Sequence, residues 1–230
     1  MCWVKSVSVK RMISVIETTA GGGNAPIYQL KVVLLESGPP VWRRLLVSGD
    51  ARLDWLHAVL QVSIGWTNSH LHQFNVGEAC YSDTRHHFAE FEDDQKILEE
   101  RKFTLRQIAP REQDAFGYEY DFGDSWEHEI TVEKILPDTV PSSPARCLDG
   151  ARACPPEDCG GVGGYDNLLK ILKNRKHLEH KSMKEWLGRP FDAAAFDVEK
   201  TNLWLRKLKW PRVTEAQLRK VLMGRDTFHE

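Results

Sequence analysis

The chain has 230 residues, of which 41% are hydrophobic and 28% are charged, and its formal net charge is −2 at pH 7. This composition excludes a disordered tail and a collagen-like fibre, and the length suits one compact unit with a single core. Because the sequence has no run of about 18 uncharged apolar residues and no secretory leader, we expect a protein without a membrane span. Five cysteines are too few for a disulfide scaffold, so we also expect reduced thiols and a cytoplasmic location.

The two ends of the chain are expected to differ from its middle. Residues 1–24 predict a flexible N-terminal extension, because the Gly-rich run that ends in Pro26 breaks regular structure. We expect one domain over residues 25–211. A C-terminal helical extension over residues 212–230 follows, with Thr214 as the cap of its helix.

The first regular elements of the domain read as a β-hairpin and a helix. Two runs of β-forming residues, 27–35 and 41–47, flank a Gly-Pro-Pro turn and predict the hairpin. Its second strand carries two adjacent arginines, so we expect it at a sheet edge or half exposed. Asp50 is the expected cap of a helix over residues 53–64, where apolar residues recur at three- and four-residue spacing.

Alternating apolar and polar residues predict three further strands. The run 71–76 is expected to pair back onto the first hairpin. The runs 116–122 and 126–136 are joined by a Gly-Asp turn and predict adjacent antiparallel strands, since a period of two places alternate side chains on one face. On the second of these strands we expect buried Trp126, Ile130 and Val132 and exposed Glu127, Glu129 and Glu133.

Helical periodicity replaces the strand pattern after Gly164. The expected helices cover residues 165–172, 182–187, 198–208 and 215–223. Strands in the first part and helices in the second predict an α+β fold. In this fold a mostly antiparallel sheet of hairpins is covered by the C-terminal helices.

Three cysteines in a loop dense with Pro and Gly form the first candidate site. Cys147, Cys154 and Cys159 follow a strand that turns His128 toward the core. Three thiolates and one imidazole would make a closed, tetrahedral, structural zinc site, with zinc as the expected cofactor. A loop of roughly 25 residues also needs an internal tie, because loops of that length are uncommon inside compact domains. The alternative is that these are small buried cysteines that pack a loop.

A second candidate site combines carboxylates with imidazoles. His70 and His72 are two residues apart on an expected strand, so their side chains can converge on one ligand, while Asp121 and Asp124 lie at the turn between two later strands. Such donors suit a metal with open coordination positions, which predicts a metal-dependent hydrolase or nuclease. The alternative is structural: an Asp in a tight turn usually bonds its own backbone, and a strand histidine is usually a half-buried polar residue.

Charge is distributed unevenly along the chain. Residues 1–169 carry a net charge of −9, whereas residues 170–225 carry +9. Four cations of the basic part lie beside two tryptophans: Arg206, Lys207, Lys209 and Arg212. This pattern fits contact with a nucleic-acid backbone, and an ordinary solvated helix face is the alternative.

Several composite motifs resemble those of one protein family. They are Tyr118–His128 (YEYDFGDSWEH), Cys154–Gly161 (CPPEDCGG), Pro40–Arg44 (PVWRR), His70–Phe74 (HLHQF) and Trp186–Gly188 (WLG), the last just before Phe191 and Asp192. Over residues 27–208 the chain resembles the plasmid pRiA4b ORF-3-like family, whose members are often labelled insertion-element passengers or resolvase-like. The resemblance implies an α+β fold and a prokaryotic, mobile-element context, without an established activity.

From the sequence we therefore expect a cytoplasmic, mobile-element-associated protein of this family, with a structural zinc site and no catalytic role. Two further hypotheses come from different classes. One is a metal-dependent hydrolase or nuclease that uses the Asp/His cluster, and the other is a nucleic-acid-binding accessory factor of a mobile element. The most informative single observation would be the metal content of protein purified without chelator or nickel resin, measured together with a thiol count.

Overall fold

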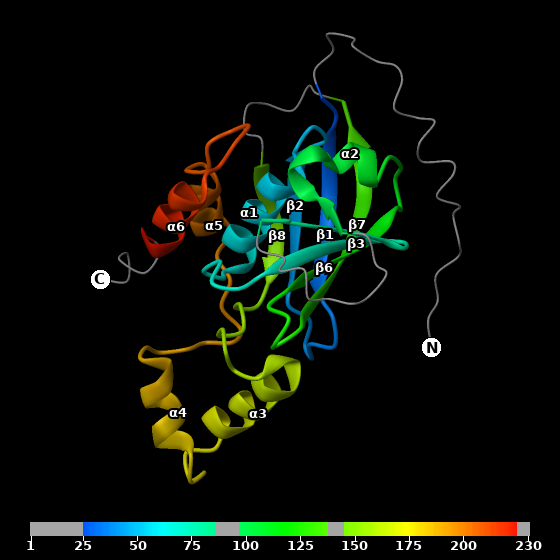
Figure 1. Ribbon diagram of the computed structural model, residues 1–230. Coiled ribbons are helices and arrows are strands. Elements are labelled where there is room, and N and C mark those ends of the chain that lie inside the picture. The colour runs from blue at the N-terminus through cyan, green and yellow to red at the C-terminus, as the bar shows by residue number, and fades with distance from the viewer. Residues whose placement is uncertain (1–24, 86–96, 138–144, 225–230) are drawn as a thin grey trace.

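The computed structural model describes residues 25–85, 97–137 and 145–224 (Figure 1). It consists of one large sheet, a group of helices against one face of this sheet, and two helices that extend away from its end. The expected N-terminal extension, residues 1–24, lies outside the described residues, as do the last six positions of the expected C-terminal extension.

Eight strands form one sheet within the described residues, in the order β5-β4-β3-β6-β7-β1-β2-β8. Every neighbouring pair is antiparallel except β4 and β5, which are parallel. This arrangement confirms the predicted α+β class and its mostly antiparallel sheet. The strands are β1 (Ile27–Leu34), β2 (Trp42–Ser48), β3 (His72–Val76), β4 (Ala79–Ser82), β5 (Ile97–Glu99), β6 (Ala115–Tyr120), β7 (Trp126–Leu136) and β8 (Ala145–Ala151).

The helices divide into a covering layer and a projecting pair. They are α1 (Leu53–Ile64), a 3₁₀ turn η3 (Glu100–Lys102), α2 (Leu105–Ile108), α3 (Gly161–Lys173), α4 (His180–Leu187), α5 (Val198–Leu205) and α6 (Glu215–Gly224). Helices α1, α5 and α6 lie on one side of the sheet, whereas α3 and α4 pack on each other beyond its end (Figure 1). Within the described residues, no helix is long and apolar enough to cross a membrane.

The main core lies between α1 and the sheet. Trp55 on α1 and Trp126 and Ile130 on β7 are at most 1% exposed and belong to one apolar cluster. Helix α6 contributes Leu218 and Leu222 to the same cluster. The helical part of the expected C-terminal extension is therefore packed against the domain.

The β6–β7 hairpin confirms the clearest strand prediction. Tyr120 pairs with Trp126, and the antiparallel register continues along both strands. Trp126, Ile130 and Val132 are buried, as predicted. Glu127 and Glu129 are exposed. Glu133 is only partly exposed, because its carboxylate binds the Arg44 guanidinium (Nε to Oε2, 2.7 Å).

Two predictions about strand neighbours are wrong. Strand β3 pairs with β4 and β6, not with the first hairpin, and β2 lies inside the sheet between β1 and β8 rather than at an edge. The second error arose from Arg43, which is 1% exposed. Its guanidinium donates to five backbone carbonyls, including Ser63 O (2.7 Å) and Ala151 O (2.9 Å), and these replace water around the buried charge.

Two local predictions also need correction. Helix α1 begins after Arg52 rather than after Asp50, whose carboxylate instead binds Arg106 (Oδ1 to Nε, 2.8 Å). The stretch expected as one long irregular loop contains β8, which extends the sheet beyond β2. Pairing with β2 supplies the internal tie for which a metal was invoked, so the length of the loop no longer argues for zinc.

Candidate metal centre

A cluster of one imidazole and two carboxylates lies at the end of the sheet where β3 begins and β6 ends. His70 precedes β3, Asp121 directly follows β6, and Asp158 lies in the loop between β8 and α3. Both aspartates adopt the left-handed backbone conformation (φ 61° and 57°), which Asp tolerates better than most residues. Three segments that are distant in sequence thus meet at one point.

The ligand atoms of this cluster lie within 4.8 Å of one another. His70 Nε2 is 3.6 Å from Asp121 Oδ2 and 3.3 Å from Asp158 Oδ1. The Nε2 atom is buried and makes no hydrogen bond within the described structure. The Asp121 side chain is 10% exposed, whereas that of Asp158 is 72% exposed. The cluster therefore has two fixed donors on its inner side and one donor that faces solvent.

Asp121 is held by its own turn. Its Oδ1 accepts the backbone N–H groups of Gly123 (3.0 Å) and Asp124 (3.4 Å), the bonds that an Asp at the start of a turn commonly makes. Its backbone N–H donates to Leu71 O (2.8 Å), which joins the turn to the segment after His70. Asp121 thus has the structural role in the turn that was considered as the alternative. This role uses Oδ1 and leaves Oδ2 directed at the imidazole of His70.

The loop that carries His70 is held by the hydroxyl of Tyr120. This hydroxyl accepts the backbone N–H groups of Ser69 (2.9 Å) and His70 (3.3 Å) and donates to Glu157 Oε1 (2.7 Å). Glu157 also accepts the backbone N–H of Thr67 (3.0 Å). The hydrogen bonds of Tyr120 and Glu157 thereby connect the segment before β3 to the residue next to Asp158.

The predicted open-site group is only half assembled. His70 and Asp121 come together as expected, but Asp124 instead accepts the backbone N–H of Gly160, at the start of α3 (Oδ2, 3.1 Å). His72 contacts Glu100 (2.8 Å). The convergence of the two histidines was wrong because His70 lies before the strand, where alternation of side chains does not apply.

The third member of the cluster, Asp158, was missed by sequence reasoning. It lies 37 positions after Asp121, in a loop with no periodicity, and no motif spacing connects the two. Its only signal was its place just before the Gly-rich start of α3.

A second group of imidazoles and carboxylate, the sealed cluster, consists of His57, His72, Glu100 and Tyr118. The rings of His57 and His72 are stacked with centroids 3.4 Å apart. His57 uses both ring nitrogens, Nδ1 toward the Tyr118 hydroxyl (2.9 Å) and Nε2 toward Asn68 Oδ1 (2.6 Å). Burial, aided by the neighbouring His72, lowers the pKa of His57 to about 3, and burial raises the pKa of Glu100 to about 7.

The four residues predicted to bind zinc each contact a nearby backbone carbonyl. Cys147 lies on β8 and its thiol contacts Asp149 O (3.4 Å), the Cys154 thiol contacts Pro155 O (3.2 Å), and the Cys159 thiol contacts Gly161 O (4.0 Å). His128 on β7 is buried, and its Nδ1 contacts Tyr118 O (3.2 Å).

These environments do not assemble a centre. Among the described residues, no three of Cys147, Cys154, Cys159 and His128 have ligand atoms within 4.8 Å of one another. Burial raises the pKa of Cys147 to about 11 and that of Cys159 to about 12. The structural zinc site stays a prediction, without support from this geometry.

The cations predicted to contact nucleic acid lie on the connection between α5 and α6. Arg206, Lys207, Lys209 and Arg212 are all exposed. The ammonium of Lys207 lies over the ring of Trp204 at 3.6 Å, and Trp204 itself is 5% exposed. Trp204 thus belongs to the core, and the nucleic-acid role of the four cations stays a prediction.

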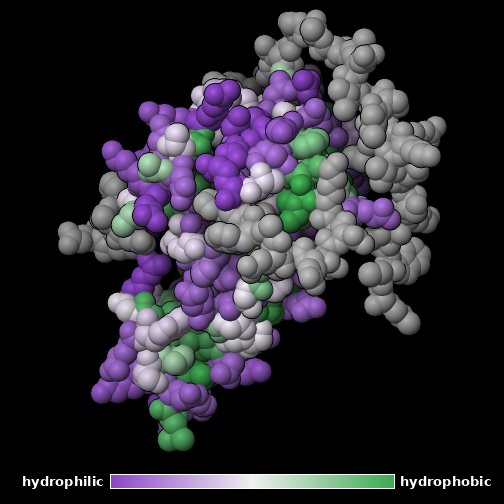
Figure 2. Space-filling view, in the orientation of Figure 1, coloured by the Kyte–Doolittle hydropathy of each residue, from purple (hydrophilic) through white to green (hydrophobic). Residues whose placement is uncertain are grey.

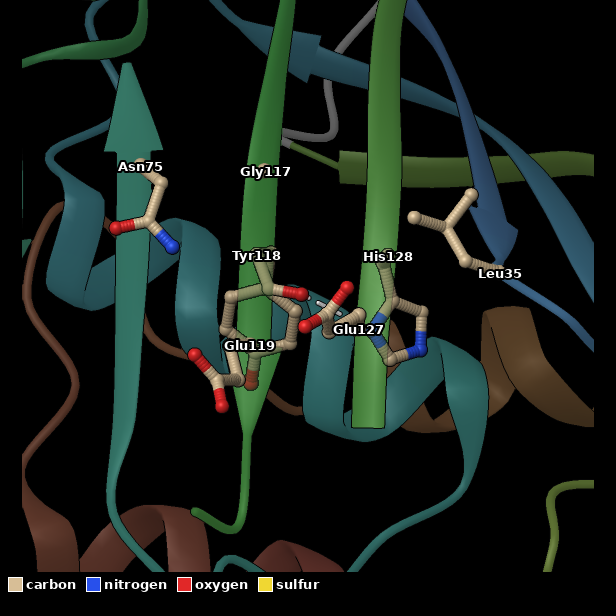
Figure 3. A pocket seen from close by; sticks show the side chains of 7 residues that line it. All are labelled: Leu35, Asn75, Gly117, Tyr118, Glu119, Glu127 and His128. Carbon is tan, nitrogen blue, oxygen red and sulfur yellow. Dashed lines mark hydrogen bonds between the residues drawn. The ribbon is translucent and has the colours of Figure 1, made fainter. Parts of the chain in front are cut away.

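A shallow hollow of about 150 Å³ opens on the sheet across β3, β6 and β7 (Figure 3). Gly117 leaves this space because it has no side chain. The buried Tyr118 and His128 also border it, and Glu119 and Glu127 line it with carboxylates. The hollow is separate from the His70 cluster and presents negative charge.

Fold and site together define an α+β protein whose antiparallel sheet carries an open His/Asp cluster at one end. Residues 26–200 match the family described as plasmid pRiA4b ORF-3-like protein, and the chain belongs to this family. The resemblance inferred from its motifs is thereby confirmed.

Two relatives extend over most of the chain. The uncharacterized protein y4hQ of Sinorhizobium fredii is 35% identical over 191 residues, which cover 82% of this chain and 96% of that protein. The crystal structure of MM3350, a protein of unknown function from Methanosarcina mazei Go1, has 31% sequence identity and a TM-score of 0.65. That match covers 76% of this chain and 97% of the other. The structural match supports the fold, and neither name states an activity.

Proposed function

We propose that the protein is a metal-dependent hydrolase whose divalent cation is held by His70, Asp121 and Asp158. The observation that carries this proposal is the approach of one imidazole and two carboxylates to within 4.8 Å, with His70 Nε2 making no hydrogen bond. Two oxygen donors and one nitrogen donor suit Mn²⁺, Fe²⁺ or Zn²⁺. Structural zinc sites are closed by four protein ligands, whereas three ligands leave a position for water.

The proposed chemistry is metal-assisted hydrolysis. A divalent cation held there would lower the pKa of a bound water toward neutrality and would thereby supply a nucleophile for hydrolysis. His70 and Asp121 would fix the cation, because both are held by the turn and loop hydrogen bonds described above. The exposed Asp158 side chain marks the side from which water and substrate approach.

The setting of this activity is also part of the proposal. Sparse cysteines favour a reducing cytoplasm, and the plasmid in the family's name favours a mobile-element context. Both statements are independent of the metal centre.

Metal binding is the first test. Protein purified without chelator or nickel resin is titrated with Mn²⁺ and with Zn²⁺ by calorimetry, and we expect one cation per chain. Asp121→Asn and Asp158→Asn should each weaken binding by more than the roughly 10–100-fold that loss of an outer-sphere partner causes. Asp149→Asn, an exposed change on β8, is the matched control and should bind like the wild type.

Hydrolysis is the second test. Bis(p-nitrophenyl) phosphate and p-nitrophenyl acetate distinguish phosphodiester from carboxylic ester substrates. We expect turnover that EDTA abolishes, that Mn²⁺ restores and that Asp121→Asn lacks. Cys154→Ser should leave metal content unchanged, and loss of the cation in that variant would instead favour the cysteine site. Wild-type protein that binds no cation would overturn the proposal.

A further inference from the structure

The α3–α4 hairpin presents an isolated basic surface. Between residues 170 and 184 it carries six Lys and Arg residues and one Glu. All six cations are exposed: Lys170, Lys173, Arg175, Lys176, Lys181 and Lys184. The hairpin extends away from the sheet, so its charges are displayed beyond the body of the molecule (Figure 1).

These charges have few partners on the protein. Lys181 approaches Glu185 at 3.7 Å, with both side chains more than two-thirds exposed, a pairing of little energetic value. In the described part of the chain, Lys170, Lys173 and Lys176 have no carboxylate within 4.0 Å. The positive charge of the hairpin is therefore available to an external anion.

The α3–α4 hairpin has buried apolar side chains that pack its helices in place. Leu168 and Ile171 of α3 are buried although they are not part of the main core, and the Tyr165 ring lies edge-on to Phe191 (centroids 6.3 Å apart). The cations consequently have defined positions on a small apolar base.

The tip of the hairpin exposes an apolar side chain. Leu178, between α3 and α4, is 99% exposed, and Trp186 on α4 is 46% exposed. Figure 2 shows this apolar end surrounded by hydrophilic surface. Apolar wedges flanked by Lys and Arg are used by proteins that insert between base steps, and exposed aromatic rings stack on unpaired bases.

We propose that this hairpin binds nucleic acid and presents its phosphodiesters to the His70–Asp121–Asp158 centre, an inference that rests on the proposed function. Helix α3 begins three residues after Asp158 and is about 20 Å long at ~1.5 Å per residue. One strand of B-DNA carries about six phosphates over that length. The two lysines of α3, Lys170 and Lys173, lie in its last turn, so a polyanion bound there would reach the centre by extending along the length of this helix.

A membrane surface fits the hairpin less well. Interfacial binding grows with the buried apolar area, and one leucine with a half-exposed tryptophan on an eight-residue helix offers little of it. The carboxylates of Glu119 and Glu127 around the hollow on the sheet would repel a polyanion, which also favours the hairpin as its contact surface (Figure 3).

The reaction at the centre would be hydrolysis of one phosphodiester. The oxygen of water bonds to phosphorus, and the P–O bond to the leaving oxygen breaks. One proton of water passes to the leaving oxygen, and the other is released from the new phosphomonoester. No oxidant or further reactant is needed.

Binding is tested without metal, so that it does not depend on catalysis. A short fluorescein-labelled oligonucleotide, single- or double-stranded, is titrated in EDTA and followed by fluorescence anisotropy over a range of salt concentrations. We expect the triple variant Lys173→Glu, Lys176→Glu, Lys181→Glu to bind at least about tenfold more weakly. For this variant, the slope of the logarithm of the binding constant against the logarithm of the salt concentration should be less steep by about 0.9 for each lost phosphate contact.

A matched control separates the two basic regions of the chain. The double variant Lys209→Glu, Arg212→Glu removes charge between α5 and α6 and should bind like the wild type. Retention of Mn²⁺ affinity by the triple variant shows that it is folded. Triple-variant binding equal to wild type would overturn the inference, as would loss of binding in the control variant alone.

Two further arms distinguish the inference from the proposed function. Asp121→Asn should bind the oligonucleotide normally and fail to cleave it when Mn²⁺ is added. Hairpin-dependent binding by a wild-type protein that binds no Mn²⁺ and cleaves nothing would overturn the proposed function and keep the hairpin as a nucleic-acid surface. Binding to phosphatidylserine vesicles with none to oligonucleotide would overturn the nucleic-acid assignment.

Discussion

Two clusters of imidazole and carboxylate lie close together in this sequence, and they differ in whether their hydrogen bonds are complete. His72 in the sealed cluster reaches Glu100 at 2.8 Å, and His57 uses both of its ring nitrogens. His70, two positions before His72, approaches Asp121 and Asp158 only at 3.6 and 3.3 Å, without a hydrogen bond from Nε2. The same residue types thus serve structure where partners close around them, and remain available to a ligand where they do not.

The difference also appears in the electrostatics. In the sealed cluster burial disfavours charge, which lowers the pKa of His57 to about 3 and raises that of Glu100 to about 7. At the open cluster the side chain of Asp158 is 72% exposed, so one of the three donors faces solvent. We expect the sealed cluster to govern stability and the open one to govern binding.

The largest effect should follow from His57→Ala. The change removes a ring stacked on His72 and leaves the hydroxyl of Tyr118 and the amide oxygen of Asn68 without that partner, so unfolding free energy should fall by ~3–5 kcal/mol. Urea unfolding measures this loss. His70→Ala is the matched change at the open cluster and should cost less than about 1 kcal/mol. Equal losses would remove the distinction between the clusters.

Saturation with Mn²⁺ should produce the next largest effect. A cation that binds only the folded chain stabilises it by about 2.7 kcal/mol at a concentration of 100 times its dissociation constant. Thermal or urea unfolding with and without Mn²⁺ gives this value. Asp158→Asn should lose most of the gain. An undiminished gain in that variant would place the cation elsewhere.

Acid should weaken the protein through its buried, neutral histidines. Burial lowers the pKa of His57 to about 3 and that of His128 to about 4, whereas both titrate near 6.5 in the unfolded chain. A lowered pKa contributes stability that is complete above pH 6.5 and is lost as pH falls through the folded value.

Each of these histidines should contribute a slope of up to about 1.4 kcal/mol per pH unit between pH 6.5 and 4.5. Urea unfolding at several pH values measures it. His128→Gln should reduce the slope by the share of one group. If His128→Gln does not alter the slope, His128 is not a buried histidine that stays neutral in the folded chain.

The smallest effect is expected at Asp124. Its carboxylate accepts the N–H of Gly160 at the start of α3, so Asp124→Asn should cost only about 0.3–1 kcal/mol by weakening the charge at the helix N-terminus. Mn²⁺ affinity should stay at the wild-type value, because Asp124 is not part of the cluster. Calorimetry of Asp124→Asn beside Asp121→Asn makes the comparison, and equal loss of affinity would return Asp124 to the site.

Local patterns in the sequence were sufficient for the elements whose side chains repeat with a short period. Alternation from Trp126 to Val132 predicted β7 and its buried face, and helical spacing predicted α3 to α6. Strand neighbours were less predictable. Arg43 argued for an edge strand, yet five backbone carbonyls, four of them from other segments, accommodate its charge inside the sheet.

The sequence by itself determined the family and the α+β class, and it named two members of the open cluster, His70 and Asp121; the turn chemistry of Asp121 is a local property, whereas His70 was expected on the strand that it precedes. Only the tertiary structure decided that Asp158 completes the cluster and that His72 turns to Glu100. The physical reason is that convergence of ligands depends on which strands become neighbours and on how a loop closes. Here the hydrogen bond from the Tyr120 hydroxyl to Glu157 holds the loop before α3 at the end of the sheet. No periodicity along the chain encodes that contact.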